Sequence, residues 1–259
     1  MYRVRIAAGT RHGETITLPR AEAHYVAHVL RLRPGDEIDA FDGVEQAYRL
    51  RLTTVSSTAV QGHVQTLRAT SPVPATPLVL GQAVPKGTRM DFIVEKSAEL
   101  GLTTLVPLYT ERTVVRALPD RALEKIGRWQ RVAAAAARQC GRRTVLDVQQ
   151  PMGLRDFCAH YRSAAVKMMC WEDEPQQGLR QFLAGRADTS VVVVLIGPEG
   201  GWTSEEIVAA RAHGFVTVQL GPYTLRTETA AIAVTSIVRY SLGDLDPPSG
   251  MACEVDNGG

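Results

Sequence analysis

The sequence predicts an α/β protein with two parts: a small N-terminal β domain and a larger domain built on a parallel sheet. Three observations support this prediction. They are long apolar runs, their regular alternation with helical patterns after residue 77, and a proline-rich stretch that separates the two parts. The clearest run is Val191–Ile196, in which four valines precede Leu195 and Ile196. Strands buried on both faces have such runs, so we expect a central strand here.

The N-terminal part has the alternating pattern and the turn residues of short strands. We expect strands at Tyr2–Ile6, Asp36–Phe41 and Ala47–Val55, with one helical stretch at Glu22–Leu30. Together these elements predict a small β-barrel over residues 1–70.

The boundary between the two parts is marked by composition. The segment Ala69–Pro77 has three prolines and no charged residue, which is typical of a stiff linker. We expect the linker itself at residues 71–77 and the second domain at residues 78–243. Residues 244–259 are expected to be a disordered tail.

Beyond the linker, strand and helix patterns alternate, which favours a parallel sheet covered by helices. Ligands of such sheets usually bind just beyond the carboxyl ends of the strands, so the loops there are candidate sites. The expected strand and helix pairs are Leu78–Val84 with Arg89–Leu100, Thr104–Leu108 with Arg121–Gln139, Ala164–Trp171 with Gln177–Leu183, Val191–Ile196 with Ser204–His213, and Phe215–Leu220 with Thr227–Leu242.

Two of these loops are unusually rich in glycine and polar residues. The first reads Gly-Pro-Glu-Gly-Gly at residues 197–201, where a missing Cβ would let a ligand approach the backbone. The alternative is a tight turn without a ligand, followed by a helix with a capping box at Thr203 and Glu206.

The second loop runs from Leu220 to Thr229 and ends in Arg226, Thr227, Glu228 and Thr229. Helix capping by Thr227, with Glu228 near the positive end of the helix dipole, is the alternative to a ligand-binding role. It leaves Arg226 unexplained.

The two loops, GPEGG and LGPYTLRTETA, resemble the ligand-binding core of the SPOUT class of RNA methyltransferases. Their pairing is similar to the RsmE family within that class, and the stretches His28–Asp36, Glu95–Gly101 and Arg138–Arg142 agree. The resemblance covers residues 1–243. It implies methylation of N3 of a uridine in 16S ribosomal RNA, with S-adenosylmethionine as the cofactor. We expect this RNA to be part of an assembled small subunit, and the sequence leaves naked RNA open as the alternative substrate.

The resemblance also implies a PUA-like barrel, a deep trefoil knot in the parallel-sheet domain, and a homodimer. The segment Ala230–Leu242 agrees with a dimer, because its apolar residues lie on more than one helical face. No metal ion is implied. The cofactor would lie against Leu195, Gly197, Gly201, Leu220, Gly221 and Leu225.

The expected chemistry points to two catalytic residues. Loss of the uridine N3 proton leaves negative charge on O2 or O4, which a fixed cation would stabilise. We expect Arg226 to supply that cation, and Glu228 to act as the base or as the partner that orients Arg226. The alternative for Glu228 is a carboxylate that interacts with the helix dipole.

Charge predicts an RNA-binding surface. Residues 86–143 carry 12 Lys and Arg against 6 Asp and Glu, although the net charge of the whole chain is +2. Such a region suits contacts with a phosphate backbone; the alternative is that the arginines solvate amphipathic helices. The expected RNA contacts are Arg11, Arg31, Arg33, Arg112, Arg138, Arg142 and Arg143.

Composition and spacing argue against other classes. The sequence has no apolar stretch long enough for a membrane span, and its four cysteines lack CxxC spacing, so we expect a reduced, cytoplasmic protein without zinc. A dinucleotide-dependent oxidoreductase would need GxGxxG early in a βαβ unit. A non-catalytic RNA-binding module would not need two ligand loops. Calorimetry with S-adenosylmethionine and with NADH would separate these classes.

Overall fold

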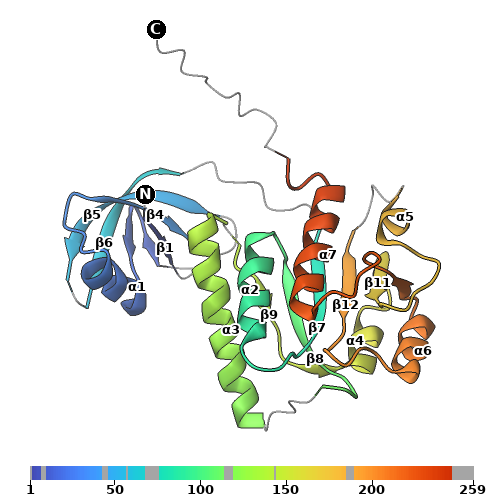
Figure 1. Cartoon of the computed structure of the whole chain (residues 1–259). Helices are drawn as coiled ribbons and strands as arrows, with labels where there is room; N and C mark the ends of the chain where they lie inside the picture. Colours follow the sequence, from blue (N-terminus) through green and yellow to red (C-terminus); the bar gives the residue numbers. More distant parts are fainter. Residues whose placement is uncertain are drawn as a thin grey trace.

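The computed structural model describes residues 2–6, 10–42, 46–56, 58–67, 76–113, 119–142, 144–184 and 190–246, with the backbone alone at 119–121. Figure 1 shows a small β domain beside a larger α/β domain, with the long helix α3 (Pro119–Cys140) between them. No helix in the described ranges is long and apolar enough to cross a membrane.

The described strands of the N-terminal domain form a mixed six-stranded sheet in the order β1-β4-β5-β6-β3-β2. Strand β1 pairs with β4 in parallel, and the other neighbours are antiparallel. Val4, Ile38 and Leu50 are fully buried on its inner face. The elements are β1 (Arg3–Arg5), β2 (Arg11–His12), β3 (Thr15–Thr17), α1 (Arg20–His24), the π-helical turn η1 (Tyr25–Val29), β4 (Glu37–Phe41), β5 (Ala47–Val55) and β6 (Val60–Leu67).

The second domain is built on a seven-stranded sheet in which every described pair is parallel. The order is β10-β8-β7-β12-β11-β13, and β9 also pairs with β8. Strand β12 lies near the centre, and all five of its residues are buried, as its valine run predicts. The strands are β7 (Leu78–Ala83), β8 (Thr104–Tyr109), β9 (Asp147–Val148), β10 (Met152–Gly153), β11 (Val166–Cys170), β12 (Val192–Ile196) and β13 (Val216–Val218).

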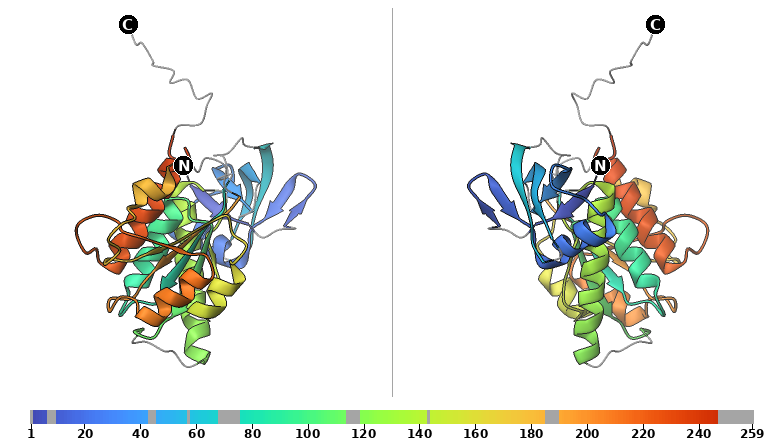
Figure 2. Two further views of the ribbon diagram at one scale, coloured as in Figure 1. Left: turned by 90° about the vertical axis from the view of Figure 1, so that its right-hand side faces the viewer. Right: turned by 90° about the vertical axis from the view of Figure 1, so that its left-hand side faces the viewer.

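Helices cover both faces of this sheet (Figure 2). Alternate residues of β12 enter two separate cores: Val192, Val194 and Ile196 pack with α2, α3, α5 and α7, whereas Val193 and Leu195 pack with α4 and α6. The remaining helices are α2 (Arg89–Glu99), α4 (Leu154–His160), α5 (Leu179–Leu183), α6 (Ser204–Ala212) and α7 (Thr227–Ser241).

The two domains meet along α3. Arg138 of this helix donates to Glu22 Oε1 of α1 at 2.9 Å, and its guanidinium lies 6.0 Å from the centre of the Tyr25 ring. Phe41 and Ala47 of the N-terminal sheet pack against Ala137 of the same helix. Apolar and ionic contacts therefore both join the domains.

The predicted elements are confirmed with boundary shifts of a few residues. The structure adds β2, β3, β6, β9, β10 and α4, which the pattern analysis did not detect. Residues 71–75 of the expected linker and residues 247–259 of the expected tail lie outside the described residues. Asp244, at the start of that tail, is ordered by a 2.6 Å hydrogen bond from Arg239. The trefoil knot stays a prediction.

Candidate active site

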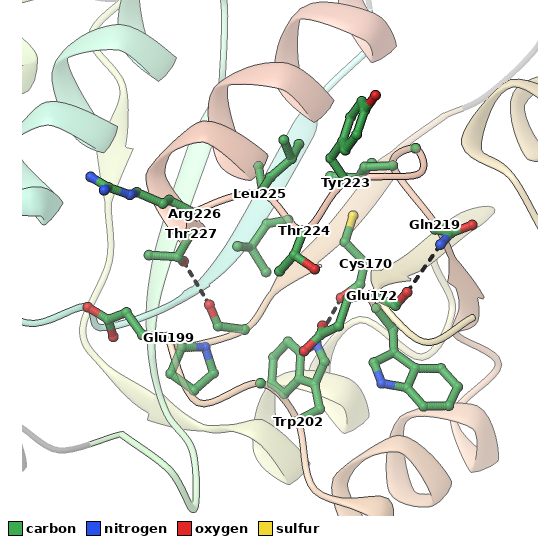
Figure 3. Close-up of a pocket in the computed structure, with 18 of the residues that line it drawn as sticks. Cys170, Glu172, Glu199, Trp202, Gln219, Tyr223, Thr224, Leu225, Arg226 and Thr227 are labelled. Carbon is green, nitrogen blue, oxygen red and sulfur yellow. Dashed lines mark hydrogen bonds between the residues drawn. The ribbon is translucent and has the colours of Figure 1, made fainter. Parts of the chain in front are cut away.

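A cleft of about 440 Å³ opens at the carboxyl ends of β11, β12 and β13 (Figure 3). Strands β11 and β12 are neighbours in the sheet, so the segments that follow them meet at the same edge. We call this the loop cleft. Its lining residues are Arg89, Cys170–Glu172, Ile196–Glu199, Gly201, Trp202, Gln219–Thr227 and Ala230.

The loop after β12 is a tight turn whose glycines have a packing reason. The Gly201 N–H donates to the Pro198 carbonyl at 3.0 Å, and the φ of +70° at Gly201 strains any other residue type. A Cβ on Gly197 would lie 3.1 Å from the Trp202 ring. The Trp202 Nε1–H in turn donates to the Cys170 carbonyl at 2.9 Å, which fixes the ring beside the cleft.

The start of α6 confirms the predicted capping box. Thr203 Oγ1 accepts from the Glu206 N–H, and Glu206 Oε2 accepts from the Thr203 N–H at 3.0 Å. The other oxygen of Glu206 accepts from the Glu111 N–H after β8 at 2.9 Å. The cap therefore also anchors the glycine turn to the neighbouring loop.

A buried chain of hydrogen bonds links the two ligand loops. Thr227 Oγ1 donates to the Gly197 carbonyl at 2.7 Å and accepts from Gln82 Nε2 at 2.9 Å. Gln82 is fully buried in β7. Arg226 is the N-cap of α7 and has no side-chain capping bond, so Thr227 links the loops and does not cap the helix.

Charged side chains gather at one end of the loop cleft. Glu199 Oε1 accepts from the Lys86 N–H at 3.0 Å and from Arg89 Nη1. Partial burial opposes ionisation of Glu199, but the backbone N–H groups and Arg89 outweigh it and lower the pKa of this carboxyl. Arg89 Nε also lies 3.8 Å from Glu228 Oε1.

Of the two predicted catalytic residues, the structure puts one in the loop cleft. Arg226 lines it, and its guanidinium makes no hydrogen bond or ion pair with any described residue. Figure 3 shows this side chain extending from the start of α7 away from Trp202 and Glu172. Glu228 is absent from the lining, faces Arg89, and makes no ion pair with Arg226 among the described residues. It lies in the first turn of α7, a position that fits the alternative of a carboxylate at the positive end of the helix dipole.

Five of the six predicted cofactor contacts line the loop cleft: Gly197, Gly201, Leu220, Gly221 and Leu225. Leu195 does not. Its fully buried side chain packs in the core on the α4 and α6 face, because it points to the opposite side of β12 from Ile196. Ile196 occupies the lining position that the sequence analysis gave to Leu195.

Three predicted RNA contacts outside the N-terminal domain bind other parts of the protein's own chain. Arg112 donates to the Gly200 carbonyl at 2.6 Å, and Arg138 pairs with Glu22. Arg142 donates to the carbonyls of Ala98 and Leu102 at 2.6 and 2.9 Å, and burial lowers its pKa to about 10. These contacts give Arg142 a structural role at the end of α2, and its predicted RNA contact stays a prediction.

The other predicted RNA contacts lie mostly on the N-terminal domain. Arg11, Arg31 and Arg33 are exposed there, and Arg11 Nε donates to the Gly13 carbonyl at 2.8 Å. Arg31 has a φ of +54°, which is uncommon for a residue other than glycine. Arg143 lies outside the described residues.

Several residues of the site escaped the sequence analysis. Arg89 was assigned to a helix without a role. Glu172 lies two residues after the end of β11, and the position of this strand beside β12 cannot be seen in the sequence. Both residues could have been chosen as candidates, because charged side chains that follow a strand of a parallel sheet often lie at the ligand-binding edge. Within the described ranges, no group of three or more His, Cys, Asp or Glu side chains is placed to hold a metal ion.

Comparison with known proteins agrees with this architecture. Residues 72–239 match the model of an RNA methyltransferase domain, and residues 18–65 match an RNA methyltransferase PUA domain. A ribosomal RNA small subunit methyltransferase E from Synechocystis is 33% identical over 230 residues, 88% of this chain and 74% of that protein.

Two solved structures are similar over almost the whole chain. One is a ribosomal RNA small subunit methyltransferase E from Neisseria gonorrhoeae bound to S-adenosylmethionine, with 32% identity, a TM-score of 0.84, and coverage of 93% of this chain and 97% of that one. The other is a putative methyltransferase from Legionella pneumophila in complex with the same cofactor, with 29% identity, a TM-score of 0.85 and the same coverage.

A PUA domain joined to a parallel-sheet domain with a loop cleft at its strand ends defines an RNA methyltransferase. Within that class, the chain belongs to the ribosomal RNA small subunit methyltransferase E family.

Proposed function

We propose that this protein transfers a methyl group from S-adenosylmethionine, bound in the loop cleft, to N3 of a uridine in the 16S RNA of the small ribosomal subunit. The observation that carries the proposal is the cleft itself, formed by the two loops that resemble the RsmE family and present in a chain of that family. When bound, the cofactor supplies an electrophilic methyl group on a sulfonium. The rest of the chemistry depends on the residues of the chain.

The loop cleft suits this cofactor. Its volume of about 440 Å³ lies within the roughly 300–1,000 Å³ of small-molecule sites. Gly197, Gly201 and Gly221 bring backbone N–H and carbonyl groups to its surface, where they can bind the edge of an adenine. The carboxylates of Glu172 and Glu199 lie in its wall, where they can interact with the positive charge of the cofactor.

Arg226 is the residue we assign to the methyl acceptor. It stands at the start of α7 directly after Leu225, and its guanidinium has no partner among the described residues. A guanidinium that turns toward the bound uridine would stabilise the charge on O2 or O4 as the N3 proton leaves. Glu228 is held by Arg89 and makes no ion pair with Arg226 among the described residues, so we propose that it fixes Arg89 and does not orient Arg226.

The test is direct. The purified protein, S-adenosylmethionine and small subunits from cells that lack this methyltransferase should yield 3-methyluridine, detected by mass spectrometry of digested RNA. Parallel reactions with deproteinised 16S RNA decide whether the assembled subunit is the substrate. Another methylated nucleoside, or no product with either substrate, would overturn the proposal. Calorimetric binding of NADH, with no binding of S-adenosylmethionine, would favour the oxidoreductase alternative.

We also propose that the protein is a cytoplasmic homodimer. Val234 and Val238 of α7 are buried within the domain, while Ile237 and Tyr240 on the same helix and Phe92 on α2 are exposed. Because α2 packs against α7, we propose that these apolar side chains form one exposed face of the domain. A second copy would cover them. Sedimentation at micromolar concentration should give twice the 28.2 kDa of one chain, and a monomer would contradict the proposal.

A further inference from the structure

Arg89 is the first residue of α2, and one guanidinium touches both ligand loops. Its Nη1 donates to Glu199 in the loop after β12, and its Nε lies 3.8 Å from Glu228 at the start of α7. The Lys86 N–H, in the loop that precedes α2, donates to the same Glu199 oxygen at 3.0 Å. Three segments that are distant in sequence are thus joined by a single cation.

The carboxylate of Glu228 depends on this cation. Glu228 is 16% exposed, and its Oε2 is buried with no hydrogen-bond partner among the described residues. A carboxylate in such surroundings is costly unless a positive charge faces it. Arg89 provides that charge, and the nearby Arg226 makes no ion pair with Glu228 among the described residues.

The consequence for the site is geometric. Glu199 belongs to the turn that contains Gly197 and Gly201, and Glu228 directly follows Arg226 and Thr227 in the sequence. The contacts of Arg89 therefore restrain both walls at the charged end of the loop cleft, while the Gln82–Thr227–Gly197 chain joins them in the protein interior. Fixing ligand-binding groups before the ligand arrives lowers the cost of binding.

We propose that Arg89 is a positioning residue whose ion pairs with Glu199 and Glu228 form a clasp that holds the two loops in their cofactor-binding arrangement. The effect of the clasp on S-adenosylmethionine affinity rests on the proposed function. Its effect on the loops themselves does not depend on any ligand.

The first experiment measures the ligand-free protein. Hydrogen exchange in Arg89→Met should be faster at amides of both residues 197–202 and 226–230, because both walls lose the same tether. The matched control is Arg128→Met. Arg128 of α3 pairs with Asp91, which lies on α2 like Arg89, and this pair is outside the loop cleft. This control should leave both loops unchanged. Faster exchange in neither loop, or in one loop alone, would overturn the clasp.

The second experiment measures S-adenosylmethionine affinity by calorimetry in Arg89→Met, Glu199→Gln and the double variant. Arg89→Met removes both ion pairs and should raise the Kd roughly tenfold, whereas Glu199→Gln removes one of them and should raise it less. The double variant should lose little more than Arg89→Met, because the pair that Glu199→Gln removes is already lost. Arg89→Lys should recover part of the loss, since it keeps the charge but lacks the planar fork. Additive losses would mean that each residue contacts the cofactor independently, and would overturn the clasp.

The two experiments also separate the proposals. A wild-type protein that fails to bind S-adenosylmethionine or to form 3-methyluridine contradicts the proposed function, while the exchange measurement still decides whether the clasp exists. A wild-type protein that is active, with an unchanged Kd in Arg89→Met, contradicts the clasp alone.

Discussion

At the residue scale, the loop cleft contains one arginine that is held and one that is not. Arg89 is fixed between Glu199 and Glu228, whereas the guanidinium of Arg226 makes no hydrogen bond or ion pair with a described residue. A held arginine suits a positioning role, because its geometry is the same before and after a ligand binds. An arginine without a protein partner suits contact with substrate, because its whole charge is available to stabilise the negative charge that develops there.

The first prediction concerns Arg226. Arg226→Ala should lower kcat roughly 10²–10³-fold, the size expected for loss of one preorganised charge partner, with the cofactor Kd unchanged. Arg226→Lys should recover part of the rate. Raising the pH toward the pKa of free uridine N3 should narrow the difference from wild type, since the proton then leaves without help. A normal kcat with a raised KM for the subunit would instead make Arg226 a phosphate contact.

At the element scale, the parts of the fold that the sequence could predict are those whose signal is local. The central strands are apolar on both faces, so β7, β11 and β12 could be read from composition alone. Strands β9 and β10 have two residues each, too few for any periodicity. The neighbours of the site depend on sheet order: Glu172 and Arg89 reach the loop cleft because β11 and β7 flank β12, and no local pattern contains that order.

The second prediction concerns the link between elements at Thr227. Thr227→Val keeps the shape but leaves Gln82 Nε2 with one partner fewer and the Gly197 carbonyl without its donor. The expected cost is about 1–3 kcal/mol of stability, together with a raised cofactor Kd, because both loops lose the bond that joins them.

Thr235→Val is the matched control for this prediction. Thr235 is also buried in α7, and its hydroxyl donates at 2.7 Å to the Ala231 carbonyl within the same helix. Loss of this hydrogen bond should lower the melting temperature and leave the cofactor Kd unchanged. Equal Kd values in the two variants would show that Thr227 contributes stability alone.

At the scale of the whole molecule, the structure divides the basic residues into two groups. Arg112, Arg138 and Arg142 stabilise the protein through their own chain, so the positive charge of residues 86–143 overstates what RNA can contact. Arg142→Glu should accordingly lower the melting temperature. Arg31 and Arg33 are exposed on the N-terminal domain, which lies across α3 from the α/β domain in Figure 1, and remain candidates for phosphate contacts.

The last prediction tests that division. The double variant Arg31→Glu with Arg33→Glu should weaken binding to small subunits and reduce the slope of log affinity against log salt by about two, because each lost phosphate contact releases about one fewer counterion. The cofactor Kd should not change, since neither residue lines the loop cleft. A variant with Arg155→Glu and Arg180→Glu changes the net charge equally through exposed arginines of α4 and α5, on the other side of the molecule from α1. If that control flattens the salt dependence as much, net charge explains the effect. The N-terminal domain would then hold the RNA through other residues.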